Sequence, residues 1–144
     1  MKKILSALAF AICILSVNFG SANYFEDLVE TYENNPDYYF VCNVQHSKIY
    51  LKLKSVEVQE YNPPHYQISG KFVDIGINFS TDKVEENFYS KTIKYNWYTK
   101  DAFEFSNGKW RKMSQGPQSS TPVAFDKKIA NSLFIAAYGM KFYD

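Results

Sequence analysis

The sequence predicts an α+β domain in which a C-terminal helix covers the aromatic face of an antiparallel β-meander of about five to seven strands. Most of the middle of the chain alternates between apolar and polar residues, which is the period of strands. The stretch 121–144 instead carries an apolar stripe at helical spacing. The stripe consists of Phe125, Ile129, Leu133, Phe134, Ala136, Ala137 and Met140. A lone amphipathic helix must bury such a stripe, and the sheet is the partner available to it.

The N-terminus has the features of a secretory signal peptide. Two lysines near the start are followed by an apolar run over residues 4–17, and Gly20 and Ala22 supply the small residues of a cleavage site. The run is shorter than the roughly 20 residues of a transmembrane helix, so an uncleaved anchor is the alternative. We expect residues 1–22 to be removed. Residues 23–144 would then form a single α+β domain that is periplasmic, cell-surface or secreted and has no stable membrane anchor.

The charge of the exported chain argues against two classes of partner. Loss of the two lysines of the signal peptide changes the formal net charge from +1 to −1. Without a basic excess, nucleic acid and anionic lipid are not favoured as partners. Five acidic residues precede Lys48, the first lysine after the signal peptide, and we expect them to form a solvated face. They are Glu26, Asp27, Glu30, Glu33 and Asp37.

Cys42 is the single cysteine of the exported chain, because Cys13 lies in the signal peptide. No disulfide can therefore form within the domain, and its stability must come from the core, which is feasible at this length. The apolar strand around Cys42 favours a buried thiol. A reactive thiol or an intermolecular bridge is the alternative for an unpaired cysteine in an exported protein.

Four elements are predicted in the first half of the exported chain. Residues 24–33 place apolar side chains at helical spacing shortly before a proline, which favours a short helix. Residues 38–45 and 49–58 are rich in aromatic and β-branched residues and favour strands. Two consecutive prolines then force a turn or an edge irregularity, and residues 65–75 resume as a strand.

The second half begins with a polar, acidic stretch over residues 76–87, which predicts a long loop. Residues 91–98 alternate as a strand, and a three-residue loop over 99–101 would place Trp97 opposite Phe103. This register gathers one apolar face from Ile93, Tyr95, Trp97, Phe103, Phe105 and Trp110. A core position is the favoured use of this face, and a carbohydrate-binding stripe is the alternative.

Asn107 and Gly108 predict a two-residue hairpin turn, because both central positions of such a turn need positive φ. The turn pairs Glu104 with Arg111 on one face and two aromatic residues on the other. Each such cross-strand pair contributes a few tenths to ~1 kcal/mol. The turn chemistry and the pairing therefore predict the same hairpin.

The residues that could carry chemistry are few. His46 and His65 are the two histidines, and neither has the spacing of a metal site. Cys42 and His46 are four strand residues apart, which is ~13 Å and too far for a nucleophile–base pair. We predict no catalytic residue, no metal and no cofactor, and a hydrolase with a dispersed site is left as an alternative.

The candidate binding residues are Tyr61, His65 and Tyr66, which flank the two prolines. Prolines stiffen the segment 61–66, and a rigid loop loses little entropy when it binds. Two aromatic side chains and one imidazole could supply contacts to a protein partner. Packing at a sheet edge is the alternative role for the same residues.

Two segments carry a resemblance to known proteins. Tyr-Asn-Pro-Pro-His-Tyr-Gln-Ile over residues 61–68 and Ala-Ala-Tyr-Gly-Met-Lys-Phe-Tyr over residues 136–143 resemble a group of small uncharacterised exported bacterial proteins. More distantly, a signal peptide followed by a short antiparallel sheet and a terminal helix is similar to the surface-adhesin protein E family. That similarity implies a surface or periplasmic protein that binds host proteins, and it rests on the fold alone.

These observations favour an exported, non-catalytic interaction module that binds a protein at the envelope or cell surface. The first alternative is a carrier that holds a small apolar ligand between the sheet and the helix. The second is the hydrolase with a dispersed site. A wide gap between sheet and helix would favour the carrier, and clustered polar groups with shifted pKa values would favour the enzyme.

Overall fold

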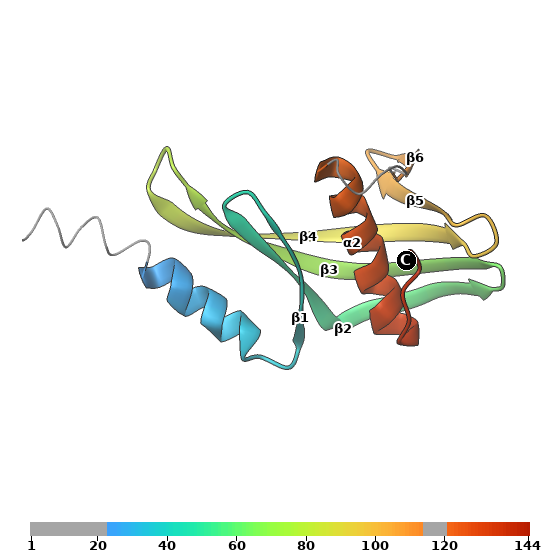
Figure 1. Cartoon of the computed structure of the whole chain (residues 1–144), viewed down its shortest axis with the longest axis horizontal. Helices are drawn as coiled ribbons and strands as arrows, with labels where there is room; N and C mark the ends of the chain where they lie inside the picture. The colour runs from blue at the N-terminus through green and yellow to red at the C-terminus, as the bar shows by residue number, and fades with distance from the viewer. Residues whose placement is uncertain (1–22, 114–120) are drawn as a thin grey trace, which may run out of the picture.

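The computed structural model describes residues 23–113 and 121–144, and it shows the predicted α+β architecture (Figure 1). The strands are β1 (Tyr38–Val44), β2 (Ser47–Asn62), β3 (His65–Asn78), β4 (Lys83–Asn96), β5 (Asp101–Ser106) and β6 (Lys109–Lys112). They form one six-stranded antiparallel sheet in the order of the chain. A helix over residues 23–33 precedes the sheet, and α2 (Thr121–Tyr138) follows it. The predicted signal peptide, residues 1–22, lies outside the described residues.

Two turns are confirmed where local chemistry predicted them. Pro63 and Pro64 form the turn between β2 and β3. Asn107 and Gly108 have φ values of 50° and 74° and join β5 to β6 in the predicted register. Both turns arise from residues whose backbone preferences leave few other conformations.

The long loop predicted over residues 76–87 is wrong. β3 continues to Asn78 and β4 begins at Lys83, so only a four-residue turn separates two strands of 14 residues each. Asp82 closes this turn with a φ of 51°. The polar residues of this region belong to strand ends that project beyond the core, and exposed strands need no alternating apolar pattern.

The predicted register between β4 and β5 is also wrong. Tyr95 pairs with Ala102 instead of Phe105, because a four-residue turn over residues 97–100 replaces the predicted three-residue loop. The register differs by three residues, which is an odd number. Because successive side chains of a strand alternate between faces, this difference turns every β5 side chain to the other side of the sheet.

The aromatic face expected from the sequence is consequently divided between the two sides of the sheet. Ile93 and Tyr95 are buried under α2, whereas Phe105 and Trp110 are 47% and 38% exposed on the opposite side. Lys94 lies beside this exposed pair, with its Nζ 4.2 Å from the centre of the Trp110 ring. Only some of the aromatic residues predicted to form one buried face therefore lie in the core under α2.

The main core lies between α2 and one face of the sheet, which we call the helix face. Ile129 and Leu133 of α2 are fully buried against it, as predicted. Gly139 ends the helix with a φ of +72°, and its N–H donates to the carbonyl of Ile135 at 2.7 Å. Met140 follows this cap and is 51% exposed, so its predicted place in the buried stripe is wrong.

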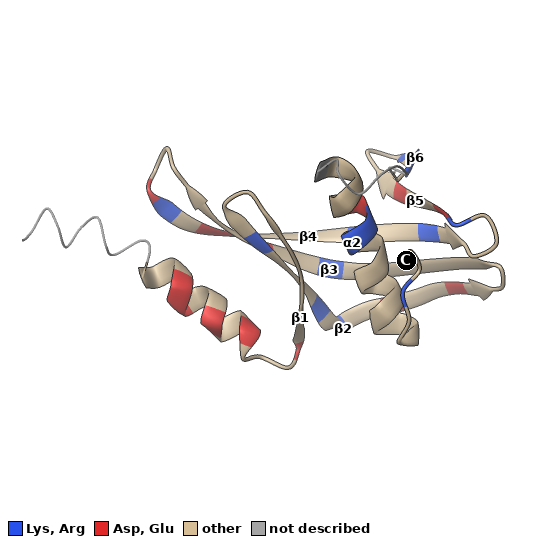
Figure 2. Ribbon diagram, in the orientation of Figure 1, with Lys and Arg blue, Asp and Glu red and all other residues tan. Residues whose placement is uncertain are grey.

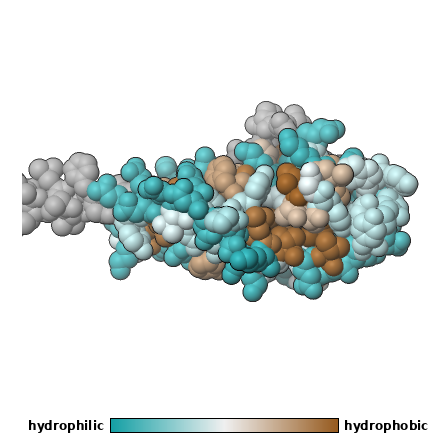
Figure 3. Space-filling view, turned by 90° about the horizontal axis from the view of Figure 1, so that it is seen from below, coloured by the Kyte–Doolittle hydropathy of each residue, from teal (hydrophilic) through white to brown (hydrophobic). Residues whose placement is uncertain are grey.

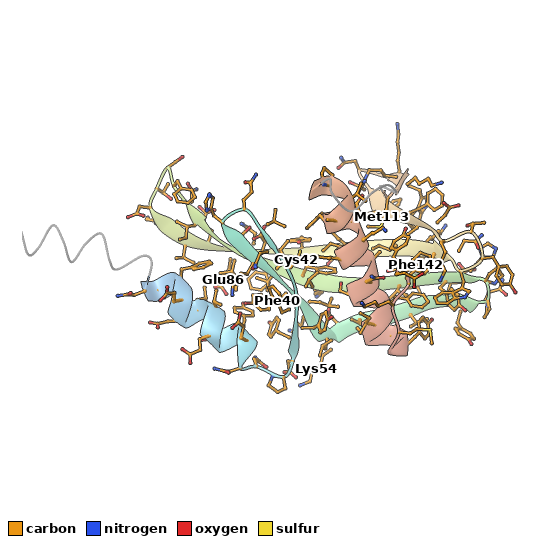
Figure 4. The ribbon with its side chains drawn as sticks, in the orientation of Figure 1. Phe40, Cys42, Lys54, Glu86, Met113 and Phe142 are labelled. Atoms are coloured by element: carbon orange, nitrogen blue, oxygen red, sulfur yellow. The ribbon has the colours of Figure 1, made fainter. Side chains whose placement is uncertain are left out.

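A second, smaller core lies on the opposite face of the sheet, under the helix of residues 23–33. Its buried members are Tyr32, Tyr50, Val73 and Ile75. Figure 4 shows Phe40 and Glu86 beside this helix, and Met113 and Phe142 beside α2. The Tyr32 hydroxyl donates to Glu86 at 2.6 Å, which fastens the helix to β4. Figure 2 shows acidic residues along this helix, and four of the five acidic residues predicted to be solvated are exposed on it. The fifth, Asp37, lies after the helix, is half-buried and pairs with Lys54 at 2.9 Å.

Candidate functional site

The two tyrosines of the predicted binding segment lie next to each other at the tip of the β2–β3 hairpin. Tyr61 pairs with Tyr66, and their ring centres are 5.7 Å apart. Tyr138 of α2 contacts both, with ring centres 6.1 Å from Tyr61 and 5.4 Å from Tyr66. Phe134, one helical turn earlier, contacts the Tyr66 ring at 5.5 Å. We call Tyr61, Tyr66 and Tyr138 the tyrosine cluster.

His65 does not join the tyrosine cluster. It is the neighbour of Tyr66 in β3 and pairs with Asn96, so its side chain belongs to the opposite face of the sheet. The residue is exposed. The backbone of its turn is fixed, because the Trp97 N–H donates to the Pro64 carbonyl at 2.8 Å. His65 therefore lies at the rim of the hairpin tip, on the other side from the tyrosines.

The tyrosine cluster combines an exposed ring with a buried hydroxyl. Tyr61 is 68% exposed although two other rings support it. Burial, and then the neighbouring Tyr66 and Tyr61, raise the pKa of Tyr138 above its ordinary value, so the hydroxyl keeps its proton. No described residue hydrogen-bonds to this buried hydroxyl oxygen. The cluster thus presents the exposed ring of Tyr61, which the rings of Tyr66 and Tyr138 support.

Tyr138 was missed by sequence reasoning. It follows Phe134 by four residues, a spacing that places both on the same side of a helix, and their rings are 4.9 Å apart. That spacing could have added Tyr138 to the apolar stripe. Its contact with Tyr61 could not have been found, because it depends on where α2 crosses the sheet.

β2 has an unpaired edge beside the tyrosine cluster. β1 pairs with β2 only as far as Lys52, and the Leu53 N–H donates to the Asp37 carbonyl at 2.8 Å. β2 then bends at an irregularity opposite Gly70. Residues 57–62 pair with β3 on one side, and within the described chain no backbone group pairs with their other side (Figure 1). We call residues 57–62 the free edge.

β2 carries exposed apolar side chains at its bend and in the free edge. Leu53 is 36% exposed and Val58 is 42% exposed. Figure 3, which views the molecule from below, shows hydrophobic residues gathered in the part where the bend of β2 and α2 lie. An exposed apolar patch rimmed by polar residues is typical of an interaction surface.

Hollows also lie outside the tyrosine cluster and the free edge. A hollow of about 300 Å³ between β1 and α2 is lined in part by Lys127, Lys128 and Lys141. A hollow of about 430 Å³ near the β1–β2 turn includes His46 and Asp74. In the described part of the chain, no group of three or more His, Cys, Asp or Glu side chains could hold a metal ion.

Cys42 and Gly70 show how the helix face is filled. Cys42 is 2% exposed, and burial raises the pKa of its thiol, as expected for a cysteine that packs as a small apolar residue. A Cβ placed on Gly70 would lie 2.6 Å from Cδ2 of Leu133 and 3.0 Å from Cδ1 of Leu51. The helix therefore packs directly on the sheet at this point.

Neither described helix combines the length and apolarity needed to cross a membrane. Comparisons with protein families, with curated proteins and with solved structures give no match for this chain. The tyrosine cluster and the free edge are the features from which a function can be inferred.

Proposed function

We propose that this chain is an exported, non-catalytic interaction module that binds a protein partner in the periplasm or at the cell surface. The tyrosine cluster forms the centre of the contact surface, and His65 lies at its rim. The observation that carries the proposal is the state of Tyr61, which is 68% exposed and yet packed against two other tyrosine rings. Export is supported by the signal-like sequence of residues 1–22.

An exposed aromatic ring that the fold already holds in place suits recognition. Tyrosine supplies a large contact area with few rotatable bonds, and it is enriched among the residues that dominate binding energy. Because neighbouring rings support Tyr61, little side-chain freedom remains to be lost on binding. The cluster is assembled from β2, β3 and α2, so only the folded domain presents it.

The close packing of the helix face supports a surface contact over the carrier. Leu133, Ile129, Ile68 and Phe72 are at most 1% exposed, and Gly70 permits direct contact between the layers. A ligand at this point would have to separate α2 from the sheet and expose these residues. That separation would cost roughly 1.5–3 kcal/mol for each large apolar side chain exposed.

Capture from an envelope extract followed by direct measurement tests the proposal. Tagged protein is used to capture partners, the captured protein is identified and purified, and its affinity is measured by calorimetry. We expect Tyr61→Ala to weaken binding about tenfold or more, because it removes the central ring. We expect His65→Ala to weaken binding less, because rim residues contribute little.

Tyr24→Ala is the matched control, since Tyr24 is also exposed, at 57%, but lies on the helix of residues 23–33. Its affinity for the partner should equal that of the wild type. Circular dichroism melts must show that all variants fold. Equal affinities of wild type and Tyr61→Ala would remove the tyrosine cluster from the contact surface. Turnover of a substrate by the purified protein would overturn the non-catalytic assignment.

A further inference from the structure

The free edge presents backbone groups to which another strand can pair. β3 occupies one side of residues 57–62, and the pairing of β1 with β2 ends before the bend. The edge of a sheet exposes a row of N–H and C=O groups and is a template for a further strand. Addition of an extended segment to such an edge is a recurrent mode of peptide recognition, in which backbone hydrogen bonds supply affinity and side chains supply specificity.

The two faces of the free edge differ in chemistry. Val58 and Tyr61 pair with Ile68 and Tyr66, so they lie on the helix face. Their neighbours on that face include Tyr138 of α2, which contacts Tyr61. An added strand would therefore place every second side chain against apolar and aromatic groups.

The opposite face of the free edge is acidic. Glu57 pairs with Ser69 and Glu60 pairs with Gln67, so both carboxylates lie on the face away from α2. Both residues are exposed, and residues 57–62 contain no lysine or arginine. The intervening side chains of an added strand would lie beside these carboxylates, where lysine or arginine is favoured and acidic residues are disfavoured.

A second copy of this chain does not fit the free edge. In a two-fold dimer the two edges run antiparallel and keep the same face on the same side of the joined sheet. In the register that overlaps the two free edges, Glu57 and Glu60 of one copy would then lie on the same face as, and diagonally near, the same two residues of the other. Like charges on neighbouring strands are destabilising. Lys54 lies at the bend and is paired with Asp37 at 2.9 Å, so it does not offset this repulsion.

We propose that the free edge binds an extended segment of another protein in which apolar residues alternate with lysine or arginine, and that this segment joins the sheet as an additional strand beside β2. This inference rests on the proposed function and names the chemistry of the partner. The apolar side chains of the segment pack on Val58 and the tyrosine cluster. Its basic side chains face Glu57 and Glu60.

Three synthetic peptides of seven residues test the proposal with the purified protein. One alternates lysine and valine, one alternates glutamate and valine, and one repeats the lysine–valine peptide with every backbone nitrogen methylated. We expect the lysine–valine peptide to bind about tenfold or more tightly than either of the others in fluorescence anisotropy. Equal binding of the methylated peptide would overturn strand addition, because methylation of every backbone nitrogen removes the backbone donors on both edges of the peptide.

Charge reversal on the protein locates the site. Glu57→Lys/Glu60→Lys should reverse the preference, so that the glutamate–valine peptide binds more tightly than the lysine–valine peptide. Glu26→Lys/Glu30→Lys makes the same change in net charge on exposed residues of the helix 23–33 and should leave the preference as in the wild type. A control variant that reverses the preference equally would overturn the location, since net charge alone would explain the binding.

The outcomes separate this inference from the proposed function. A captured partner that is lost with Tyr61→Ala but unaffected by Glu57→Lys/Glu60→Lys would keep the interaction module and overturn pairing at the free edge. Reversal of the peptide preference would support strand addition at the free edge even if Tyr61→Ala binds the captured partner with normal affinity. In that case the tyrosine cluster would be overturned as the centre of the contact surface.

Discussion

Gly70 lies in β3 directly beneath Leu133 of α2, and it sets how closely the helix approaches the sheet. A Cβ at this position would lie 2.6 Å from Cδ2 of Leu133, which is closer than van der Waals contact allows. Leu133 is fully buried, so its side chain has little room to move aside. The absence of a side chain at Gly70 therefore lets the helix and the sheet pack closely.

A double-mutant cycle tests this contact. We expect Leu133→Ala to destabilise the domain by ~2–5 kcal/mol, because it leaves a cavity, and Gly70→Ala to cost ~1–3 kcal/mol through overpacking. The destabilisation of the double variant should be smaller than the sum of the two single destabilisations by ~1 kcal/mol or more, because the cavity left by Leu133→Ala accepts the new methyl group. Denaturant melts measure all four proteins. Additive effects would mean that the two side chains do not share this space.

Residue-level features were predictable where local chemistry decides them. The positive φ of Asn107 and Gly108 and the buried state of Cys42 follow from the residue types and their immediate neighbours. Met140 shows the limit of such reasoning. It fits the helical spacing, but Gly139 ends the helix one residue earlier and leaves Met140 outside the core.

At the scale of elements, Arg111, whose side chain is 48% exposed, joins the β5–β6 hairpin to α2 through two buried carboxylates. Arg111 donates to Glu104 at 2.6 Å and to Asp126 of α2 at 3.1 Å. Lys91 of β4 also contacts Glu104. The side chains of Glu104 and Asp126 are 8% and 7% exposed, so both carboxylates are removed from water. The two carboxylates raise the pKa of Arg111 above its ordinary value, and the guanidinium stays charged.

Removal of Arg111 should loosen α2 from the hairpin. We expect Arg111→Met to destabilise the domain by about 2–4 kcal/mol, since two buried carboxylates lose a charged hydrogen-bond donor. Lys112→Met is the matched control, because the Lys112–Asp101 pair is more exposed, at 53% and 25% for the two side chains. It should cost less than ~1 kcal/mol. Similar melting midpoints for the two variants would show that the Arg111 contacts contribute no more than a surface ion pair.

The β4–β5 register shows why element positions were only partly predictable. Apolar residues occur on both sides of β5, since Ala102 faces α2 and Phe103 faces away. Glu104 is buried by its ion pairs, so the alternation of apolar and charged residues indicated the wrong face. The length of the turn decides between the two registers. Nothing in residues 97–100 specifies a three-residue turn rather than a four-residue turn.

At the scale of the molecule, the two helices cover opposite faces of different parts of the sheet (Figure 1). α2 packs across β1, β2 and β3 and reaches Ala102 of β5, and the helix of residues 23–33 covers the part near the β1–β2 turn. The meander and the C-terminal helix were predictable from periodicity, because both patterns are local. The second core was not, because which face the N-terminal helix covers depends on long-range packing.

The candidate site was also predictable only in part, because some of its members are local in the sequence and others depend on long-range packing. The segment 61–66 indicated Tyr61 and Tyr66 through its prolines and aromatic residues, and the structure brings these two together. The third tyrosine, Tyr138, belongs to α2 and lies more than 70 residues later in the chain. The free edge depends on where β1 ends relative to β2, which is a property of the sheet and not of any one segment.

Export is the prediction that concerns the whole chain. Because Gly20 and Ala22 follow a short apolar run, we expect cleavage after Ala22 and a first residue of Asn23. N-terminal sequencing of the protein recovered from the periplasm or the medium measures this directly. Ala22→Leu should slow processing, because signal peptidase requires a small residue there. A full-length chain retained in the membrane would show that the N-terminus acts as an anchor, and the domain would then face its partners from the membrane surface.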